Sequence, residues 1–199
     1  MAHIDYYFTP ASPWAYLGSR RFIDMVERYK ASVRVMPVDI GKVFATSGGL
    51  PLAKRPPQRQ AYRLMELKRW RDFLDLPLVL QPRVLPVDPG LACRLIIAAR
   101  DTEQNALMLA HRIGQALWAE ERDIGDPDTL EEIVTEAGLD PAPLFGAAEG
   151  EAVKAAMQAD TDRAIAANVF GAPTYAIDGE LFWGQDRLDF VERALAARV

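Results

Sequence analysis

Apolar and polar positions follow a strand pattern at both ends of the chain and a helix pattern in the middle. Residues 3–8, HIDYYF, form a short apolar run that is typical of a buried strand. A helix is predicted from Pro13 to about Tyr29, where apolar residues recur on one face. Residues 33–38, VRVMPV, predict a second strand. A strand, a helix and a strand in this order indicate a parallel, right-handed βαβ unit.

The middle of the chain, from about Lys42 to Phe170, shows helical spacing and no convincing pair of strands. Five helices are indicated by apolar residues three and four positions apart: Leu67, Trp70 and Leu74; Leu91, Leu95, Ile96 and Ala99; Leu107, Ala110, Gly114 and Leu117; Leu130, Ile133, Val134 and Ala137; Val153, Met157, Ala164 and Ile165. Asp88-Pro89 marks the start of the second of these, and Gly138 the end of the fourth. Residues 46–58, rich in glycine and proline, predict a mobile loop.

The C-terminal end returns to strand spacing. Alternating apolar residues flank Asp178-Gly179, with Tyr175 and Ile177 before it and Leu181 and Trp183 after it. Asp-Gly between two alternating runs predicts a β-hairpin. A last helix carries Leu188, Val191 and Leu195 on one face. We therefore expect an α/β fold in which the two β regions join into one sheet and the helical block is an insertion.

Composition narrows the class of protein. The chain has 199 residues and a net charge of -5, which argues against a nucleic-acid partner because phosphate binding usually requires a basic surface. The single cysteine, Cys93, cannot form an internal disulfide and is expected in the core. Neither a signal peptide nor a membrane span of about 18 apolar residues is evident, which predicts a soluble, cytoplasmic protein. Two histidines and one cysteine give no metal-ligand spacing.

Two proline motifs stand at the edges of the predicted sheet. Ser12 followed by Pro13 is a strong helix start, a hydroxyl N-cap and a proline at the first helical position. Serine is a common N-cap, so the residue type alone favours a structural role. Pro173 precedes the third strand, where an ordinary trans proline is more frequent. A cis Ala172-Pro173 bond would instead leave the backbone of Ala172 free to pair with an extended peptide.

The order of the elements is that of thioredoxin. In thioredoxin-like disulfide oxidases the first helix begins Cys-Pro-x-Cys, whereas residues 12–15 here read Ser-Pro-Trp-Ala. Without either cysteine this position cannot exchange a dithiol, which favours the use of an external thiol. With SPWAYLG at 12–18, VFGAPTYAIDGELFWGQDRLDF at 169–190 and the helical insertion between them, nearly the whole chain resembles the 2-hydroxychromene-2-carboxylate isomerases, relatives of the kappa-class glutathione transferases.

The resemblance implies a fold, a cofactor and a reaction. The fold is a thioredoxin-like domain of residues 1–43 and 168–199 with a large α-helical insertion of residues 44–167 that forms a substrate pocket above Ser12. The cofactor is glutathione, and the assembly is a homodimer. The reaction is the glutathione-dependent conversion of 2-hydroxychromene-2-carboxylate, or a similar conjugated aromatic carboxylate, to trans-o-hydroxybenzylidenepyruvate.

The resemblance also implies roles for individual residues. The Ser12 hydroxyl would face the glutathione sulfur and stabilise its thiolate, helped by the helix terminus, whose charge effect is about 0.3–1 kcal/mol. The backbone of Ala172, fixed by Pro173, would pair with the cysteinyl backbone of glutathione. Gln185 and Asp186 begin the last helix and would bind the γ-glutamyl carboxylate and ammonium. For Asp186, a plain acidic residue at a helix start is the commoner role.

The middle of the chain contributes one further candidate and one departure. Arg59, three residues before Tyr62, lies where relatives carry a basic residue and would bind a carboxylate; a solvated helix charge is nearly as frequent. Relatives often carry asparagine where this chain has Leu50, so the substrate contacts of that loop stay open. Side chains expected to serve only in packing or on the surface are His111, Trp70 and Trp118. For Trp183, beside the last strand, two places stay open, the pocket wall and the core, of which the core is favoured.

Two other functions remain open from the sequence. A kappa-type transferase would use the same site but release the glutathione adduct as its product. A non-catalytic thioredoxin-like binding module would have no turnover to lose. A disulfide oxidase is disfavoured because Cys-x-x-Cys is absent.

Overall fold

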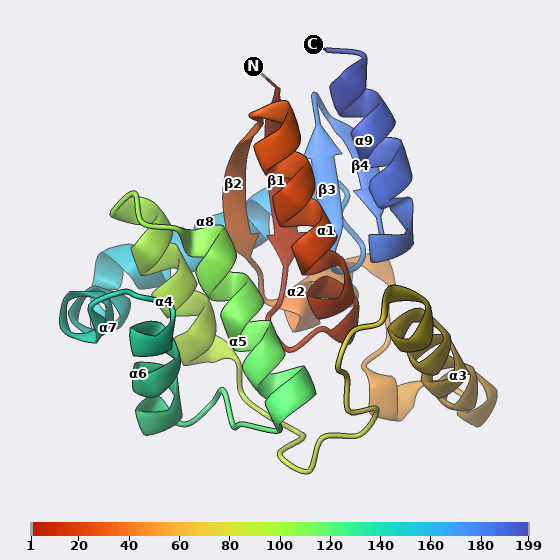
Figure 1. Cartoon of the computed structure of the whole chain (residues 1–199), viewed down its shortest axis with the longest axis horizontal. Coiled ribbons are helices and arrows are strands. Elements are labelled where there is room, and N and C mark those ends of the chain that lie inside the picture. Colours follow the sequence, from red (N-terminus) through yellow and green to blue (C-terminus); the bar gives the residue numbers. More distant parts are fainter. Residues whose placement is uncertain (1, 199) are drawn as a thin grey trace.

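A four-stranded mixed sheet forms the centre of the computed structural model, which describes residues 2–198 (Figure 1). The strands are β1 (His3–Phe8), β2 (Ser32–Pro37), β3 (Thr174–Ile177) and β4 (Glu180–Trp183), in the order β2-β1-β3-β4. β1 pairs with β2 in parallel, and β3 pairs antiparallel with both β1 and β4. The predicted single sheet is confirmed, with β2 beginning and ending one residue earlier than expected.

Helices cover both faces of this sheet. Residues of α1 (Pro13–Tyr29) and α9 (Leu188–Ala196) share one core with the Ile4, Tyr6 and Phe8 side of β1. Residues of α2 (Ile40–Ser47) and α8 (Glu151–Ala166) pack with Tyr7 on the other face. This division follows from the strand period, because successive side chains of β1 point to opposite faces.

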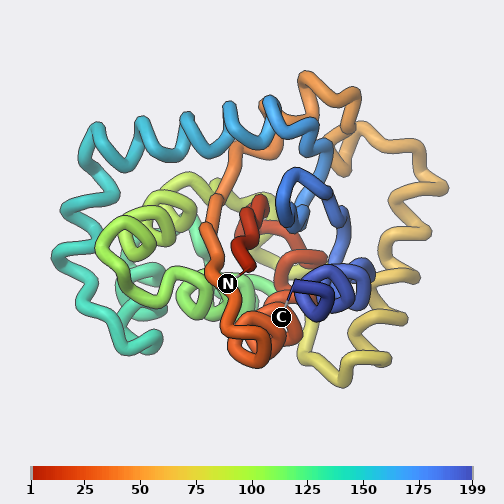
Figure 2. Tube along the Cα trace, turned by 90° about the horizontal axis from the view of Figure 1, so that it is seen from above, coloured from red at the N-terminus to blue at the C-terminus, as the bar shows by residue number. Residues whose placement is uncertain are grey.

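The remaining helices lie on two sides of the sheet. α3 (Pro57–Leu74) stands on the side of β4 and α9, while α4 (Gly90–Asp101), α5 (Ala106–Glu120), α6 (Pro127–Glu136) and α7 (Pro141–Glu149) gather on the side of β2 (Figures 1 and 2). Two short 3-10 helices, η1 (Leu52–Lys54) and η2 (Gln185–Arg187), precede α3 and α9. None of the helices within residues 2–198 has the length and apolar character needed to span a bilayer.

The five helices predicted for the middle of the chain are confirmed, and two short ones, α2 and α7, were missed. Both lack a long apolar stripe, but both have an aspartate N-cap. Asp39 accepts from Gly41 N at 2.9 Å, and Asp140 accepts from Ala142 N at 3.2 Å. The predicted loop 46–58 is shorter than expected, because its ends belong to α2 and α3. The domain boundaries at residues 44 and 168 stay a prediction.

The hairpin between β3 and β4 forms at the predicted turn. Asp178 and Gly179 both have positive φ angles, 51° and 85°, as a two-residue hairpin turn requires. The turn sets the register in which Tyr175 lies opposite Phe182. Tyr175 also pairs with Tyr6 of β1, and their rings are stacked with centroids 5.2 Å apart. The aromatic side chains therefore join the two β regions of the chain.

A buried ion pair ties α8 and α4 to the edge of the sheet. The Arg100 guanidinium on α4 donates to the Asp160 carboxylate on α8 at 2.5 Å and to the backbone carbonyl of Val35 on β2 at 3.0 Å. The Asp160 side chain is only 1% exposed. Burial raises the pKa of the Asp160 carboxyl, and Arg100 offsets part of this rise. The charge of Asp160 thus depends on Arg100.

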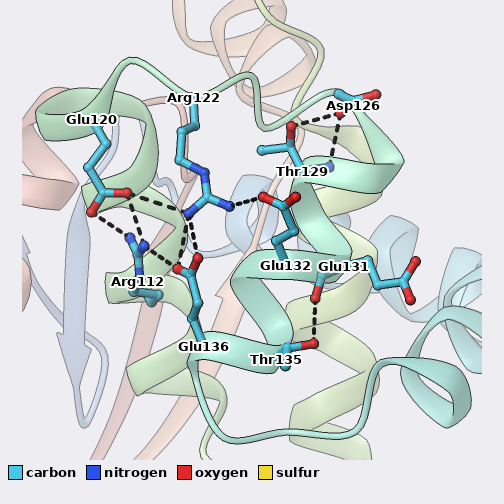
Figure 3. A network of polar contacts seen from close by, with 9 residues as sticks. All are labelled: Arg112, Glu120, Arg122, Asp126, Thr129, Glu131, Glu132, Thr135 and Glu136. Carbon is cyan, nitrogen blue, oxygen red and sulfur yellow. Dashed lines mark hydrogen bonds and ion pairs between the residues drawn. The ribbon is translucent and has the colours of Figure 1, made fainter.

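A second, more exposed network links α5 and α6 (Figure 3). Arg112 binds Glu120 in a two-pronged pair, with both distances 2.9 Å, and also contacts Glu136. Arg122 donates to Glu136 at 3.0 Å and to Glu132 at 2.8 Å. Shared carboxylates make this a network rather than a set of isolated surface pairs, which individually contribute little.

Replacing Arg100 with methionine should lower the free energy of unfolding by about 3 kcal/mol, because the buried Asp160 carboxylate would keep only its longer ion pair with Arg34, at 3.7 Å. Denaturant unfolding followed by circular dichroism measures the loss. The matched control is Lys154→Met on the same helix as Asp160, which removes an exposed pair with Glu151 and should cost less than about 0.5 kcal/mol. Equal losses in the two variants would contradict the role given to Arg100.

Candidate functional site

A groove of about 660 Å³ opens between the start of α1, one side of α3 and the segment from β4 to η2. Four of the predicted site residues line it: Arg59, Ala172, Gln185 and Asp186. Ser12 and Pro173 are not on its lining, but each is close in sequence to a lining residue, Trp14 and Ala172 respectively. α3 is the only helix of the predicted insertion to contribute; α4–α8 supply no lining residue. The expectation that the insertion as a whole forms the pocket is therefore too broad.

Ser12 caps α1 as predicted. Its Oγ accepts a hydrogen bond from Ala15 N at 3.3 Å, and the residue is 8% exposed. The hydrogen bond from Ala15 uses only a lone pair of the oxygen, and the hydroxyl hydrogen itself has no acceptor among residues 2–198. Ser12 can therefore cap the helix and donate to a ligand atom at the same time.

The peptide bond between Ala172 and Pro173 is cis, which was the less frequent of the two alternatives left open by the sequence. Ala172 is half-buried and lies on the groove. Neither its N–H nor its C=O has a hydrogen-bond partner among residues 2–198. The Pro173 carbonyl, in contrast, is paired within the protein, because it accepts from Gly184 N at 2.9 Å. The groove thus has a free peptide edge at Ala172.

The segment after β4 places Gln185 and Asp186 beside this edge. Gly184 has a φ of 103°, which favours glycine, and turns the chain into η2. Gln185 and Asp186 begin η2 rather than the last α-helix itself, which starts at Leu188. As the first residues of a helical turn, both keep backbone N–H groups without an intrahelical acceptor. Asp186 is exposed and pairs with Arg187 at 3.3 Å.

Arg21 holds this segment against α1. Its Nη2 donates to the Gln185 carbonyl at 2.8 Å and to the Gln185 side-chain oxygen. The guanidinium also lies over the Trp70 ring of α3, with Cζ 5.8 Å from the centroid. Gly18 allows the close approach, because a Cβ there would lie 2.8 Å from Gln185 Cβ. Arg21 therefore connects the three walls of the groove.

Trp183 lies on the groove wall rather than in the core. It is 50% exposed and lines the groove, so the core place favoured from the sequence is wrong, and the alternative of a place on the pocket wall is the one observed. Trp70 combines helix packing with a place on the groove wall, while Trp118 is buried. Cys93 is buried as predicted, and burial raises its pKa to about 12. His111, which was expected to serve in packing or on the surface, contacts Ser19 Oγ through Nδ1 at 2.7 Å.

Sequence reasoning missed several lining or supporting residues, among them Trp14, Arg21, Arg55 and Arg63. A signal existed for two of them, because Arg55 and Arg63 lie four residues before and after Arg59, the spacing of one helix face. Arg21 had no such signal, since its partner Gln185 is 164 residues away. Leu50, where the resemblance implies asparagine, is 43% exposed, and its carbonyl accepts from Arg55 Nε at 2.8 Å.

Comparison with known proteins identifies the family of this chain. The sequence matches the DSBA-like thioredoxin domain family over residues 3–196. The chain belongs to this family. At the start of α1 this member of the family reads Ser-Pro-Trp-Ala over residues 12–15 and carries no Cys-x-x-Cys there. The predicted thioredoxin-like fold is confirmed.

Relatives of this DSBA-like thioredoxin domain confirm the narrower resemblance. A 2-hydroxychromene-2-carboxylate isomerase from Sphingobium xenophagum is 28% identical, over 96% of this chain and 97% of its own. Glutathione S-transferase kappa 1 from Caenorhabditis elegans is 24% identical, over 96% of this chain and 89% of its own. The solved structure of a 2-hydroxychromene-2-carboxylate isomerase has a TM-score of 0.80 at 24% identity and covers 98% of this chain and 95% of its own.

Replacing Arg21 with methionine should loosen η2, because Gln185 loses two hydrogen bonds from a charged donor, each contributing about 1.5–3 kcal/mol. Amide hydrogen exchange at residues 184–188 should become at least about tenfold faster. The neighbouring Arg20→Met, which removes an exposed pair with Asp24, is the control and should leave those amides unchanged. Unchanged exchange in Arg21→Met would show that Arg21 does not hold η2.

Proposed function

We propose that this chain catalyses the glutathione-dependent isomerisation of 2-hydroxychromene-2-carboxylate, or of a similar conjugated aromatic carboxylate, to trans-o-hydroxybenzylidenepyruvate. It is an enzyme of the glutathione-dependent isomerase type: three of its relatives are named 2-hydroxychromene-2-carboxylate isomerase, and a fourth is named Glutathione S-transferase kappa 1. One observation carries the proposal: the free peptide edge of Ala172 lies on the same groove as the start of α1, where serine replaces the first cysteine of a disulfide oxidase.

The groove residues fit the groups of glutathione, a tripeptide with two carboxylates, one ammonium and a central thiol. The N–H and C=O of Ala172 would pair with the cysteinyl backbone. The free N–H groups of Gln185 and Asp186 would bind the γ-glutamyl carboxylate, and the Asp186 carboxylate would bind the ammonium. Arg59 would bind the glycyl carboxylate. Each charged group of the tripeptide thus finds an opposite charge or an N–H donor on one groove.

When bound, glutathione supplies a nucleophilic thiol that adds reversibly to a conjugated double bond and so makes rotation about it easy. Ser12 donates its free hydroxyl hydrogen to the thiolate, which lowers the free energy of the charged form. The start of α1 adds a favourable field worth about 0.3–1 kcal/mol. Trp14, Trp70 and Trp183 provide apolar walls for an aromatic ring. Ser12 acts in this scheme as a thiolate stabiliser and forms no covalent bond.

A kappa-type transferase is the second candidate, favoured by the resemblance to Glutathione S-transferase kappa 1. It uses the same thiol, but the adduct leaves as product, so glutathione is consumed. Incubation of the protein with glutathione and 2-hydroxychromene-2-carboxylate separates the two candidates. The isomerase returns glutathione undiminished, whereas consumption of glutathione with a halogenated aromatic, without isomerisation, identifies the transferase.

The proposal includes a homodimer and a cytoplasmic location. The isomerases that the chain resembles are usually homodimeric, and light scattering in solution tests this directly. A cytoplasmic location suits an enzyme that draws on reduced glutathione, the main thiol of that compartment.

Replacing Ser12 with alanine should lower the turnover number about 10- to 100-fold, because a hydrogen bond to a charged group contributes about 1.5–3 kcal/mol. The free energy of unfolding should fall by only about 1 kcal/mol, the usual cost of an N-cap. Absorbance of the two isomers measures turnover, and the thiolate band near about 240 nm measures the ionised fraction of bound glutathione.

Two variants separate catalysis from helix capping. Ser12→Thr keeps both the cap and the hydroxyl donor and should retain most of the turnover. Asp140→Ala removes the N-cap of α7, remote from the groove in sequence, and should lose similar stability with no loss of turnover. If Ser12→Ala turned over as fast as the parent chain, Ser12 would be a helix cap only.

A further inference from the structure

Positive charge dominates one wall of the groove. Its lining carries four arginines, Arg55, Arg59, Arg63 and Arg187, and two carboxylates, Glu66 and Asp186. Each carboxylate already has an arginine partner, Arg69 for Glu66 and Arg187 for Asp186. Among residues 2–198, no carboxylate forms an ion pair with Arg55, Arg59 or Arg63. We call these three residues the arginine row.

The members of the arginine row lie close enough to repel one another. Burial and, after it, the charge of Arg59 lower the pKa of Arg55. Burial and, after it, the charge of Arg55 lower the pKa of Arg63. Arginine stays protonated in spite of such shifts, so the repulsion persists. Three neighbouring cations that form no ion pair within residues 2–198 indicate that anionic ligands complete this wall.

Arg63 occupies the less exposed end of the row. Arg59 is exposed, whereas Arg63, one helical turn or about 6 Å further along α3, is half-buried. The Arg63 guanidinium lies over the Trp118 ring, with Cζ 6.0 Å from the centroid. The indoles of Trp14 and Trp70 line the same groove. A guanidinium held beside an indole ring on an aromatic-lined groove is suited to the carboxylate of an aromatic ligand, which it can bind through two parallel hydrogen bonds.

We propose that Arg63 is the specificity-determining residue that binds the carboxylate of the aromatic substrate, while Arg59 binds glutathione. This inference rests on the proposed function only for the assignment of glutathione to Arg59. It predicts that the groove selects aromatic acids over neutral aromatics of the same shape. Arg55, fixed by its hydrogen bond to the Leu50 carbonyl, adds positive charge beside Arg63 and is not required to touch the substrate.

Isothermal titration calorimetry with 2-naphthoate and its neutral counterpart 2-naphthamide tests the inference without turnover. The unaltered chain should bind 2-naphthoate at least about tenfold more tightly than 2-naphthamide, with and without glutathione present. Arg63→Gln should abolish this preference by weakening 2-naphthoate about 10- to 100-fold, while the affinity for 2-naphthamide changes less than about twofold. Arg63→Lys should keep part of the preference because it keeps the charge.

Two further variants serve as controls. Arg71→Gln on the same helix removes an exposed pair with Asp72 and should change neither affinity. Arg59→Gln should weaken glutathione and leave the preference for 2-naphthoate intact. The inference is overturned if Arg63→Gln keeps the preference, if Arg59→Gln loses it, or if the unaltered chain binds both ligands equally. A chain that binds no glutathione but shows an Arg63-dependent preference would contradict the proposed function and support the inference.

Discussion

The antiparallel pairing of β1 with β3 is the contact on which the rest of the structure depends. It joins Tyr6, near one end of the chain, to Tyr175, near the other, and their stacked rings lie in the core shared with α1 and α9. Such a distant pairing closes a long loop, whose entropic cost rises only slowly with length. The pairing brings the start of α1 next to Ala172 and η2, so the groove exists only when both ends of the chain are in the sheet.

The arginines on the two sides of the sheet differ in how they are paired. On the β2 side, arginines and carboxylates pair within the protein, as in the Arg100–Asp160 pair and the Arg112–Arg122 network of Figure 3. On the α3 side the arginine row has no such partners within the described residues 2–198. The groove is therefore cationic although the net charge of the chain is -5. This local positive charge allows an acidic chain to bind carboxylate ligands.

Much of the fold followed from short-range patterns in the sequence. A short apolar run marked β1, alternation marked β3, Ser12-Pro13 marked the start of α1, and Asp178-Gly179 marked the hairpin. The candidate site was predictable only as far as its motifs extend along the chain. Arg21 and Trp183 were missed or misplaced because their environment is set by contacts between distant segments, which no local pattern reports. Alternation correctly assigned Trp183 to a strand but left undecided what covers its face.

A structure of this chain with glutathione tests the central claim most directly. We predict that the cysteinyl backbone of glutathione pairs with the N–H and C=O of Ala172, and that its sulfur lies within hydrogen-bond distance of Ser12 Oγ. We also predict that, in this complex, the groove beside Arg63 remains open for a second ligand. Glutathione bound away from Ala172, or with its sulfur turned away from Ser12, would contradict the roles proposed for these two residues.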